Sequence, residues 1–170
     1  LCILNLGGGY MIRSKDFYMK GVYNSLGKKL GIVEDLFINF FEGKVTGLKI
    51  SNYSLFSKKN YIDAKDIISI DKVIIVSQSL NETGIEFKSL KGIDIKDKYG
   101  VIIGVLEDII IDEESFSIKG LVVSSGLIER MVKGKEILLI SECILAEEYI
   151  LYLGSQKINL KAMPRKVERL

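Results

Sequence analysis

The sequence repeats itself after 73 residues, and this internal duplication restricts the folds that the chain can adopt. The segment "GIVEDLFIN" at residues 31–39 returns as "GVLEDIIID" at residues 104–112, with the same glycine and the same acidic pair. The shift needs no gap, and the identical pairs include Gly27 with Gly100, Gly31 with Gly104, Glu34 with Glu107, Asp35 with Asp108, Gly47 with Gly120, Leu48 with Leu121 and Ser51 with Ser124. Because a repeat of this length is one structural unit used twice, we expect two similar domains.

The repeat also predicts the domain boundaries. Beyond Ser51 the register slips by three residues, after which "DKVIIV" at 71–76 matches "EEYILY" at 147–152. We interpret the slip as a loop of variable length. The predicted organisation is a leader at 1–10, a first domain at 11–78, a linker at 79–90, a second domain at 91–154 and a basic C-terminal tail at 155–170.

Each copy has the pattern of an all-β domain. Short segments rich in isoleucine, valine, leucine and aromatic residues alternate with turn residues, as in "NSLGKK" and "NFFEGK" of the first copy and "KDKYG" and "DEESFS" of the second. Runs such as "EDIIID" are too short for a helix, and β-branched residues favour strands. Five or six short strands hide their edges best by curling into a barrel, so the chain is predicted to form two tandem small β-barrels.

The composition excludes several classes of function. The chain contains no histidine, which removes the commonest general base and transition-metal ligand. Its two cysteines, Cys2 and Cys143, form no CxxC pair and no disulfide framework, which favours a reducing cytoplasm. The net charge of +2 is too weak to indicate a nucleic-acid partner by itself, and no apolar run approaches the roughly 20 residues of a membrane span.

The leader "LCILNLGGGY" matches nothing later in the chain, whereas "MIRSKDF" from Met11 reads as a bacterial start. We interpret residues 1–10 as translated upstream sequence, in which a purine-rich ribosome-binding site gives Gly7, Gly8 and Gly9. A vector-derived segment and a flexible arm remain alternatives. Under each of the three, the leader carries no chemistry. N-terminal sequencing of native protein from its own host tests the first.

The two copies share an order of motifs. The first copy contains "KGVYNSLGKKLGIVEDLFIN", "GKVTGLKIS" and "IDAKDIISIDKVIIV", and the second contains "LKGIDIKDKYGVIIGVLEDIIID", "IKGLVVSSG" and "EILLISECILAEEYILYLG". On these motifs, from about Met11 to Gly154, the chain resembles the PRC-barrel family, which includes the photosynthetic reaction-centre H subunit and the C-terminal domain of a ribosome maturation factor. The resemblance implies a non-catalytic protein-binding module. Tandem proteins of this kind look most like those of spore-forming Firmicutes, which suggests a link to sporulation.

The acidic pairs Glu34–Asp35 and Glu107–Asp108 are predicted to be structural. Adjacent side chains of a strand point to opposite faces, so the two carboxylates of a pair do not converge on one substrate unless a bulge intervenes. One member is expected to bond backbone or turn groups while the other faces water. A metal site at Asp108, Asp112, Glu113 and Glu114 is the alternative, since hard cations prefer carboxylate oxygens.

The repeated glycines are predicted to serve turns and close strand contacts rather than a phosphate-binding loop, because no glycine-rich segment opens a helix. These structural glycines are Gly27, Gly31, Gly47, Gly100, Gly104 and Gly120.

The loops at which the two copies differ are the predicted partner-binding sites, because loops on a rigid scaffold commonly carry binding. "NYSLFSKKNY" and "SGLIERMVKGKE" mix apolar and basic side chains. The candidates are Leu55, Phe56, Lys58, Lys59, Leu127, Ile128, Arg130, Met131 and Lys133. The alternative is that their apolar members plug the barrel ends or pack one barrel on the other.

The sequence therefore predicts a non-catalytic cytoplasmic adaptor that binds an unknown protein partner or a second copy of itself, with no cofactor, metal or catalytic residue. An RNA- or ribosome-associated factor is the first alternative, because the tail carries five basic residues against one acidic residue. The tail could also touch a membrane surface electrostatically, although a frayed, solvated terminus explains it as well. A peripheral membrane-complex subunit is a more distant alternative.

Overall fold

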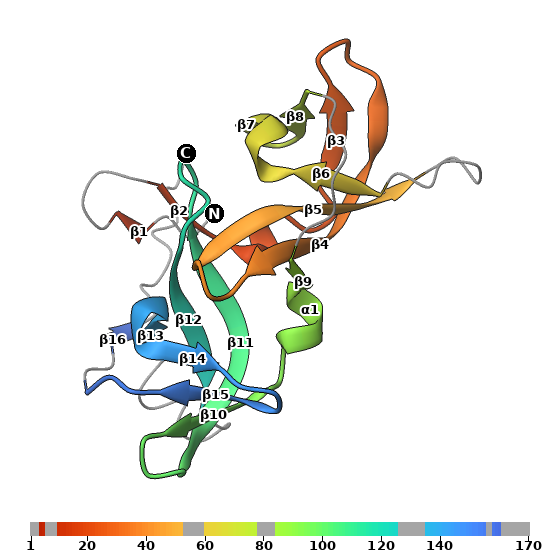
Figure 1. The fold of residues 1–170 in the computed structure, drawn as a ribbon. Coiled ribbons are helices and arrows are strands. Elements are labelled where there is room, and N and C mark those ends of the chain that lie inside the picture. The colour runs from red at the N-terminus through yellow and green to blue at the C-terminus, as the bar shows by residue number, and fades with distance from the viewer. Residues whose placement is uncertain are drawn as a thin grey trace.

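The computed structural model describes residues 4–5, 10–52, 60–77, 84–125, 135–155 and 158–160, and both repeats are built almost entirely from short strands (Figure 1). The strands of the first repeat are β3 (Gly21–Asn24), β4 (Lys29–Asn39), β5 (Lys44–Asn52), β6 (Tyr61–Asp63), β7 (Ile67–Ile70) and β8 (Ile74–Val76). The strands of the second repeat are β10 (Asp94–Asp97), β11 (Ile102–Asp112), β12 (Ile118–Ser124), β13 (Lys135–Leu139), β14 (Cys143–Leu145) and β15 (Tyr149–Tyr152).

The two repeats have the same sheet topology. The strands follow the order β6-β5-β4-β3-β8-β7 in the first repeat and β13-β12-β11-β10-β15-β14 in the second. Each repeat has one parallel pair of strands, β3 with β8 in the first and β10 with β15 in the second. The other neighbouring strands in these two orders are antiparallel. The short 3-10 helices η2 (Ala64–Asp66) and η3 (Ile140–Glu142) connect the two ends of each sheet. The prediction of two tandem small β-barrels is confirmed.

A β-bulge lies at the acidic pair of each repeat. On β4, Val33 pairs with Ile50 and Asp35 with Lys49, which leaves Glu34 as an extra residue. The pairing of β11 with β12 is interrupted in the same way at Glu107. Because a bulge re-aims side chains and bends the strand, it explains why long strands of this kind can wrap around a small barrel.

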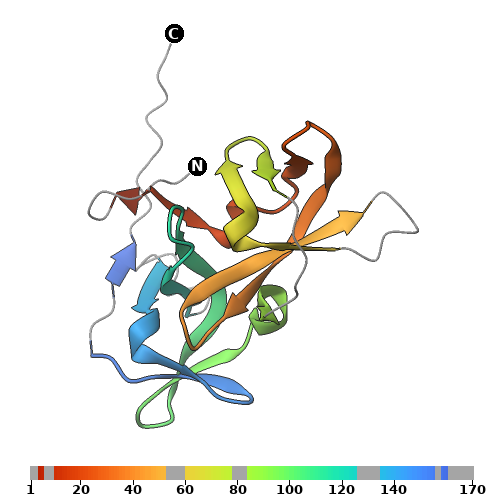
Figure 2. The same cartoon turned by 45° about the horizontal axis from the view of Figure 1, so that its top comes forward.

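The segment that precedes each repeat pairs with the other repeat. Arm 1 comprises β2 (Tyr10–Arg13) and the 3-10 helix η1 (Ser14–Asp16), and β2 pairs antiparallel with β11. Arm 2 comprises β9 (Ile85–Glu86) and α1 (Phe87–Leu90), and β9 pairs antiparallel with β4. Figure 2 shows β2 beside β11 and α1 beside β4. The arms correspond under the shift of 73 residues, so this exchange is reciprocal.

The hairpin tips complete the junction between the repeats. The N–H of Val45 donates to the carbonyl of Phe116 at 2.9 Å, and the N–H of Ile118 donates to the carbonyl of Gly43 at 2.6 Å. These two bonds are equivalent under the repeat. Buried side chains of both repeats, from Val22 and Leu36 in the first to Ile95 in the second, form one hydrophobic cluster. The two barrels therefore share a core.

Several ordered elements lie in segments that were predicted to be leader, linker or tail. Leu4–Asn5 form strand β1, which pairs with β2, and residues 85–90 of the predicted linker form arm 2. Ile158–Leu160 of the predicted tail form β16, which pairs with β13 at the edge of the second sheet. An unpaired strand edge favours such additions because its backbone groups otherwise need water.

Candidate functional site

Asp35 holds arm 2 against the first repeat. Its side chain is 1% exposed and accepts hydrogen bonds from the backbone N–H of Leu36 at 2.8 Å and of Lys88, in α1, at 3.1 Å. Burial raises the pKa of Asp35 because the charged form loses hydration. Its neighbour Glu34 is exposed. In this pair the side chain of Asp35 holds the backbone of arm 2, and the carbonyl of Glu34 accepts a hydrogen bond from the Nζ of Lys88 in the same arm.

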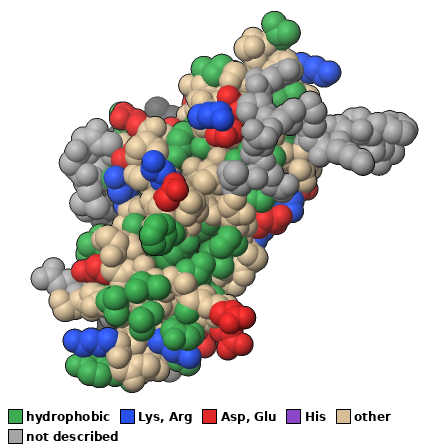
Figure 3. Space-filling model, in the orientation of Figure 1, with side chains coloured by type: hydrophobic (Ala, Val, Ile, Leu, Met, Phe, Trp, Pro, Cys, Tyr) green, Lys and Arg blue, Asp and Glu red, His purple; other side chains and the backbone are tan. Residues whose placement is uncertain are grey.

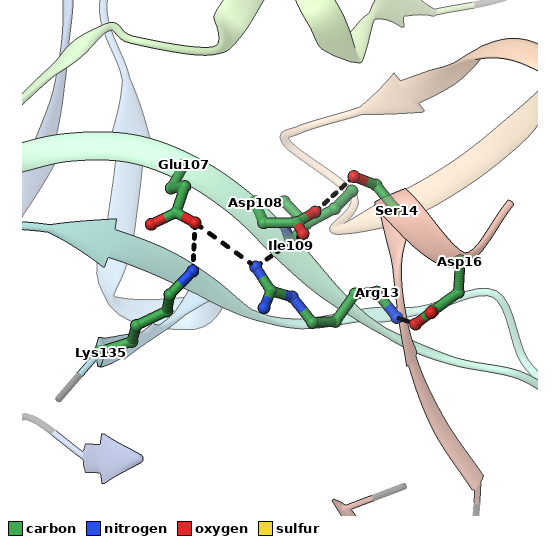
Figure 4. A network of polar contacts seen from close by, with 7 residues as sticks. All are labelled: Arg13, Ser14, Asp16, Glu107, Asp108, Ile109 and Lys135. Carbon is green, nitrogen blue, oxygen red and sulfur yellow. Dashed lines mark hydrogen bonds and ion pairs between the residues drawn. The ribbon is translucent and has the colours of Figure 1, made fainter. Parts of the chain in front are cut away.

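Asp108 holds arm 1 against the second repeat in the equivalent place. It accepts a hydrogen bond from the hydroxyl of Ser14 and forms an ion pair with Arg13 at 2.7 Å (Figure 4). Glu107 also faces Arg13, at 4.0 Å, and forms an ion pair with Lys135. The exception that was left open for a bulge therefore applies to this pair. The bulge at Glu107 turns both toward one guanidinium.

The glycines repeated in the two copies lie where a side chain does not fit or where the backbone turns. Gly27 and Gly100 adopt φ angles of 77° and 80° in the turns that precede β4 and β11, a region that favours glycine. A Cβ on Gly31 would stand 1.9 Å from the carbonyl oxygen of Ser51. These contacts give the glycines a role in strand packing.

Two of the four residues of the alternative metal site, Asp108 and Asp112, are engaged in other contacts. Asp108 binds arm 1, and Asp112 accepts hydrogen bonds from the N–H and hydroxyl of Ser115 at 2.9 and 2.7 Å. These bonds lower the pKa of Asp112 because they favour its charged form. In the part of the chain that the structure describes, no group of three histidine, cysteine or carboxylate side chains is placed to hold a metal ion.

All nine predicted partner-binding residues lie outside the described residues. Leu55, Phe56, Lys58 and Lys59 fall in the undescribed range 53–59, and Leu127, Ile128, Arg130, Met131 and Lys133 fall in 126–134. Their role remains a prediction.

A groove of about 710 Å³ lies at the junction of the repeats, and it is a candidate site that the sequence did not indicate. We call it the junction groove. The tip of the β4–β5 hairpin and β9 form one wall, and η3 and β14 form the other. The apolar wall residues are Ile38, Phe40, Phe41, Ile85, Ile140, Cys143, Ile144 and Leu145. Figure 3 shows hydrophobic side chains gathered on this face.

Three groove residues are unusually exposed for their type: Phe41 at 99%, Ile144 at 52% and Ile85 at 41%. Clustered apolar side chains on a water-exposed face commonly mark an interaction site. Cys143 is half-buried in the same wall, and burial raises the pKa of its thiol to about 12. The thiol is protonated near neutral pH, which disfavours a thiolate nucleophile in the groove.

The internal duplication supplies a comparison site, because the same junction occurs on the other side of the molecule. There, Phe116 and Met11 occupy the positions that Gly43 and Gly84 occupy at the junction groove. Phe116 packs against the core, and Met11 is 7% exposed. Two large side chains thus fill space that two glycines leave open.

The walls of the two sites also differ in polarity. Glu114 takes the place of Phe41, Ala64 that of Ile140, and Lys65 that of Ser141. Two hollows of about 520 and 360 Å³ remain at the second site. The first is lined by charged residues of both signs, among them Lys65 and Glu114, and Glu114 also lines the second. Because the same fold builds both sites, the fold alone does not require an apolar groove.

The fold defines a class of protein, a duplicated small β-barrel whose two copies exchange their leading arms. The chain belongs to the PRC-barrel family, since the PRC-barrel domain matches it twice, at residues 11–79 and 82–146. The predicted family is confirmed. No curated protein matches the chain. Within the described ranges, no helix is long and apolar enough to cross a bilayer.

The junction groove could have been suspected from one feature of the sequence. The turn "NFFEGK" places two phenylalanines where turns usually carry polar residues, and the second copy has Glu113 and Glu114 there. Nothing in the sequence indicates that the tip of this hairpin, at Gly43, lies beside Ile140, because these residues come together only through the exchange of arms and the contact of the hairpin tips.

Proposed function

We propose that this tandem PRC-barrel protein is a non-catalytic adaptor that binds a protein partner in the junction groove. The observation that carries the proposal is the difference between the groove and its counterpart. Phe41, exposed in the groove, is replaced in the counterpart by Glu114, although the two residues have equivalent positions in the repeat. An exposed aromatic side chain beside a hollow has the properties of a binding anchor.

The chemistry of the described residues supports a binding role over catalysis. Asp35 and Asp108 are used to hold the arms, and the thiol of Cys143 is protonated near neutral pH. The absence of histidine from the sequence removes the usual proton carrier. Turnover by the purified protein that is abolished by Glu34→Gln or Glu107→Gln would contradict a non-catalytic role.

Affinity capture from the native host tests the proposal when it compares matched variants. Phe41→Glu installs the residue of the counterpart site and should remove the partner. Ile68→Glu changes an exposed apolar residue of β7, 60% exposed, at the counterpart site and should retain it. A partner that is still captured by the Phe41→Glu variant, but not by a variant that carries Phe56→Ser and Ile128→Ser, would place binding at the variable loops instead.

Capture is followed by titration of the purified partner against the same variants. Binding through apolar burial should change little with salt, whereas binding to RNA should weaken steeply. This separates the adaptor from the RNA- or ribosome-associated alternative, whose loop lysines and basic tail fall mainly in undescribed ranges.

We further propose that the adaptor works in the cytoplasm, because two cysteines without a disulfide framework suit a reducing compartment. A role in sporulation rests on the resemblance to tandem proteins of spore-forming Firmicutes alone. Timing of expression relative to spore formation in the native host tests that role, and constant expression in vegetative cells would contradict it.

A further inference from the structure

The charged side chains of the junction groove and of the turn after β14 are acidic, and the nearby Lys96 of β10 lies over the ring of Tyr149. Among the described groove residues, Glu42 is the one charged side chain, and no lysine or arginine lines the walls. Glu147 and Glu148 follow the wall residue Leu145 in the turn between β14 and β15. All three glutamates are exposed. The corresponding turn of the first repeat carries Asp71 and Lys72, whose charges cancel.

A free strand edge lies beside the groove. β14 is the last strand of its sheet and pairs only with β15 among the described strands. Figure 1 shows β15 on one side of β14 and the tip of the β4–β5 hairpin on the other. The N–H of Cys143 already donates to the carbonyl of Ile140, and the remaining unpaired backbone groups of β14 lie on the edge that borders the groove. An extended peptide can add to such an edge while its side chains enter neighbouring hollows.

From these features we infer that the junction groove binds an extended segment of a partner protein, in which apolar side chains are flanked by lysine or arginine. The apolar residues contact Phe41, Ile140 and Ile144, the basic residues face Glu42, Glu147 and Glu148, and the peptide backbone pairs with β14. This inference rests on the proposed adaptor function and names the chemistry of the partner.

The two kinds of contact have different consequences. Burial of apolar side chains against an aromatic anchor supplies most of the affinity, so loss of Phe41 should weaken binding by roughly 30-fold or more. Exposed charges contribute less and mainly speed association, so their effect should shrink as salt screens them. Backbone pairing with a strand edge requires free N–H groups on the peptide.

The probe is a random 12-residue peptide library displayed on phage and selected against the full chain. Enriched peptides should contain apolar residues next to lysine or arginine. The strongest peptide is then synthesised and titrated. Phe41→Glu, and Gly43→Phe, which fills the groove as Phe116 fills its counterpart, should each weaken binding by roughly 30-fold. Urea denaturation establishes that both variants are folded.

Charge and backbone pairing are tested on the same peptide. The double change Glu147→Lys and Glu148→Lys should weaken binding by about tenfold at low salt and less at high salt, whereas Asp71→Lys in the corresponding turn should have no effect. N-methylation of alternate peptide nitrogens should weaken binding by about tenfold when it blocks the N–H groups that face β14.

The outcomes separate the partner chemistry from the proposed function. Enriched peptides that are neutral or acidic, yet lose binding with Phe41→Glu, would overturn the basic partner and leave a protein-binding groove. If neither Phe41→Glu nor Gly43→Phe weakens binding of the peptides, both the basic partner and the protein-binding groove would be overturned. Failure to enrich any peptide would overturn the inference alone, because capture of a folded partner decides the adaptor function. If the chain forms a dimer and Phe41→Glu dissociates it, the occupant of the groove is a second copy of the chain. That result would also overturn the inference.

Discussion

The contact between Arg13 and Asp108 is nearly buried, with side chains 16% and 4% exposed. Its counterpart in the first repeat is different, since Glu86 of arm 2 pairs with Lys49 and these side chains are 40% and 27% exposed. The two arms therefore carry opposite charges at equivalent positions. This difference disfavours the placement of either arm on the wrong repeat, because Glu86 would then face Glu107 and Asp108.

Arg13→Ala should lower the free energy of unfolding by about 3 kcal/mol, because it leaves the carboxylate of Asp108 buried without its cation. Lys49→Ala is the matched control and should cost less than about 1 kcal/mol, since its pair is screened by water. Urea denaturation of both variants measures the difference. Equal losses would contradict the assignment of arm 1 to a buried ion pair.

Asp35 should make stability depend on pH. Burial raises its pKa above 3.8 in the folded protein, so the folded state binds a proton more readily than the unfolded state. Its favourable contribution is complete below 3.8 and is lost as pH rises through the raised pKa.

The free energy of unfolding of the wild type relative to Asp35→Asn should therefore decrease as pH rises above 3.8 and through the raised pKa, with a slope of at most about 1.4 kcal/mol per pH unit. Chemical denaturation across this range gives the difference between the two proteins. A difference that stays constant with pH would show that the folded state does not shift this pKa.

The exchanged arms have equivalent strands but unequal surroundings. Ile12 of β2 pairs with Ile111 and is 5% exposed, whereas Ile85 of β9 pairs with Ile38 and is 41% exposed at the junction groove. The groove thus lies beside Ile85 of β9, which is exposed, whereas the equivalent Ile12 of β2 is covered at the counterpart site. Ile85 is exposed although its strand joins the two repeats. This exposure agrees with a surface that binds a partner.

Ile12→Ala should destabilise the protein by about 2 to 4 kcal/mol because it removes a buried side chain from the shared core. Ile85→Ala should cost less than about 1 kcal/mol, because much of that side chain already contacts water. Thermal or urea unfolding of the pair measures both. Similar losses would indicate that the groove is closed in solution.

The two barrels should unfold as one cooperative unit. They share a hydrophobic cluster, each holds the arm of the other, and their hairpin tips are joined by backbone hydrogen bonds. Opening of one barrel would expose the core and release the arm of the second. Contacts between the repeats therefore contribute to the stability of both barrels. We expect a single unfolding transition for the whole chain.

Leu36→Ala, a change at a fully buried residue of the first repeat, should lower the stability of both repeats by about 3 kcal/mol. Hydrogen exchange is the measurement, and the amide protection of Ile109 and Leu121 in the second repeat should fall together with that of Leu48 in the first. Loss of protection in the first repeat alone, or two separate unfolding transitions, would contradict a shared core.

Much of the fold was predictable because the pattern that specifies it is local and occurs twice. Short apolar segments rich in β-branched residues predict the strands, and the glycines at 27 and 100 mark equivalent turns. The bulges were not predictable, since nothing about Glu34 or Glu107 alone requires an extra residue in the pairing. The predicted binding loops fall in undescribed ranges, and the junction groove was missed because its walls are far apart in sequence.

The sequence determines that the chain forms two similar barrels, because a duplicated strand pattern with its turn glycines specifies the same local structure twice. It leaves open which barrel each arm joins, since arms 1 and 2 are themselves copies and fit either sheet edge by backbone pairing. Long-range contacts decide this, through the charges of Arg13 and Glu86 and the burial of Ile12. The same contacts bring the tip of the β4–β5 hairpin, at Gly43, to Ile140 and thereby create a groove that no single segment encodes.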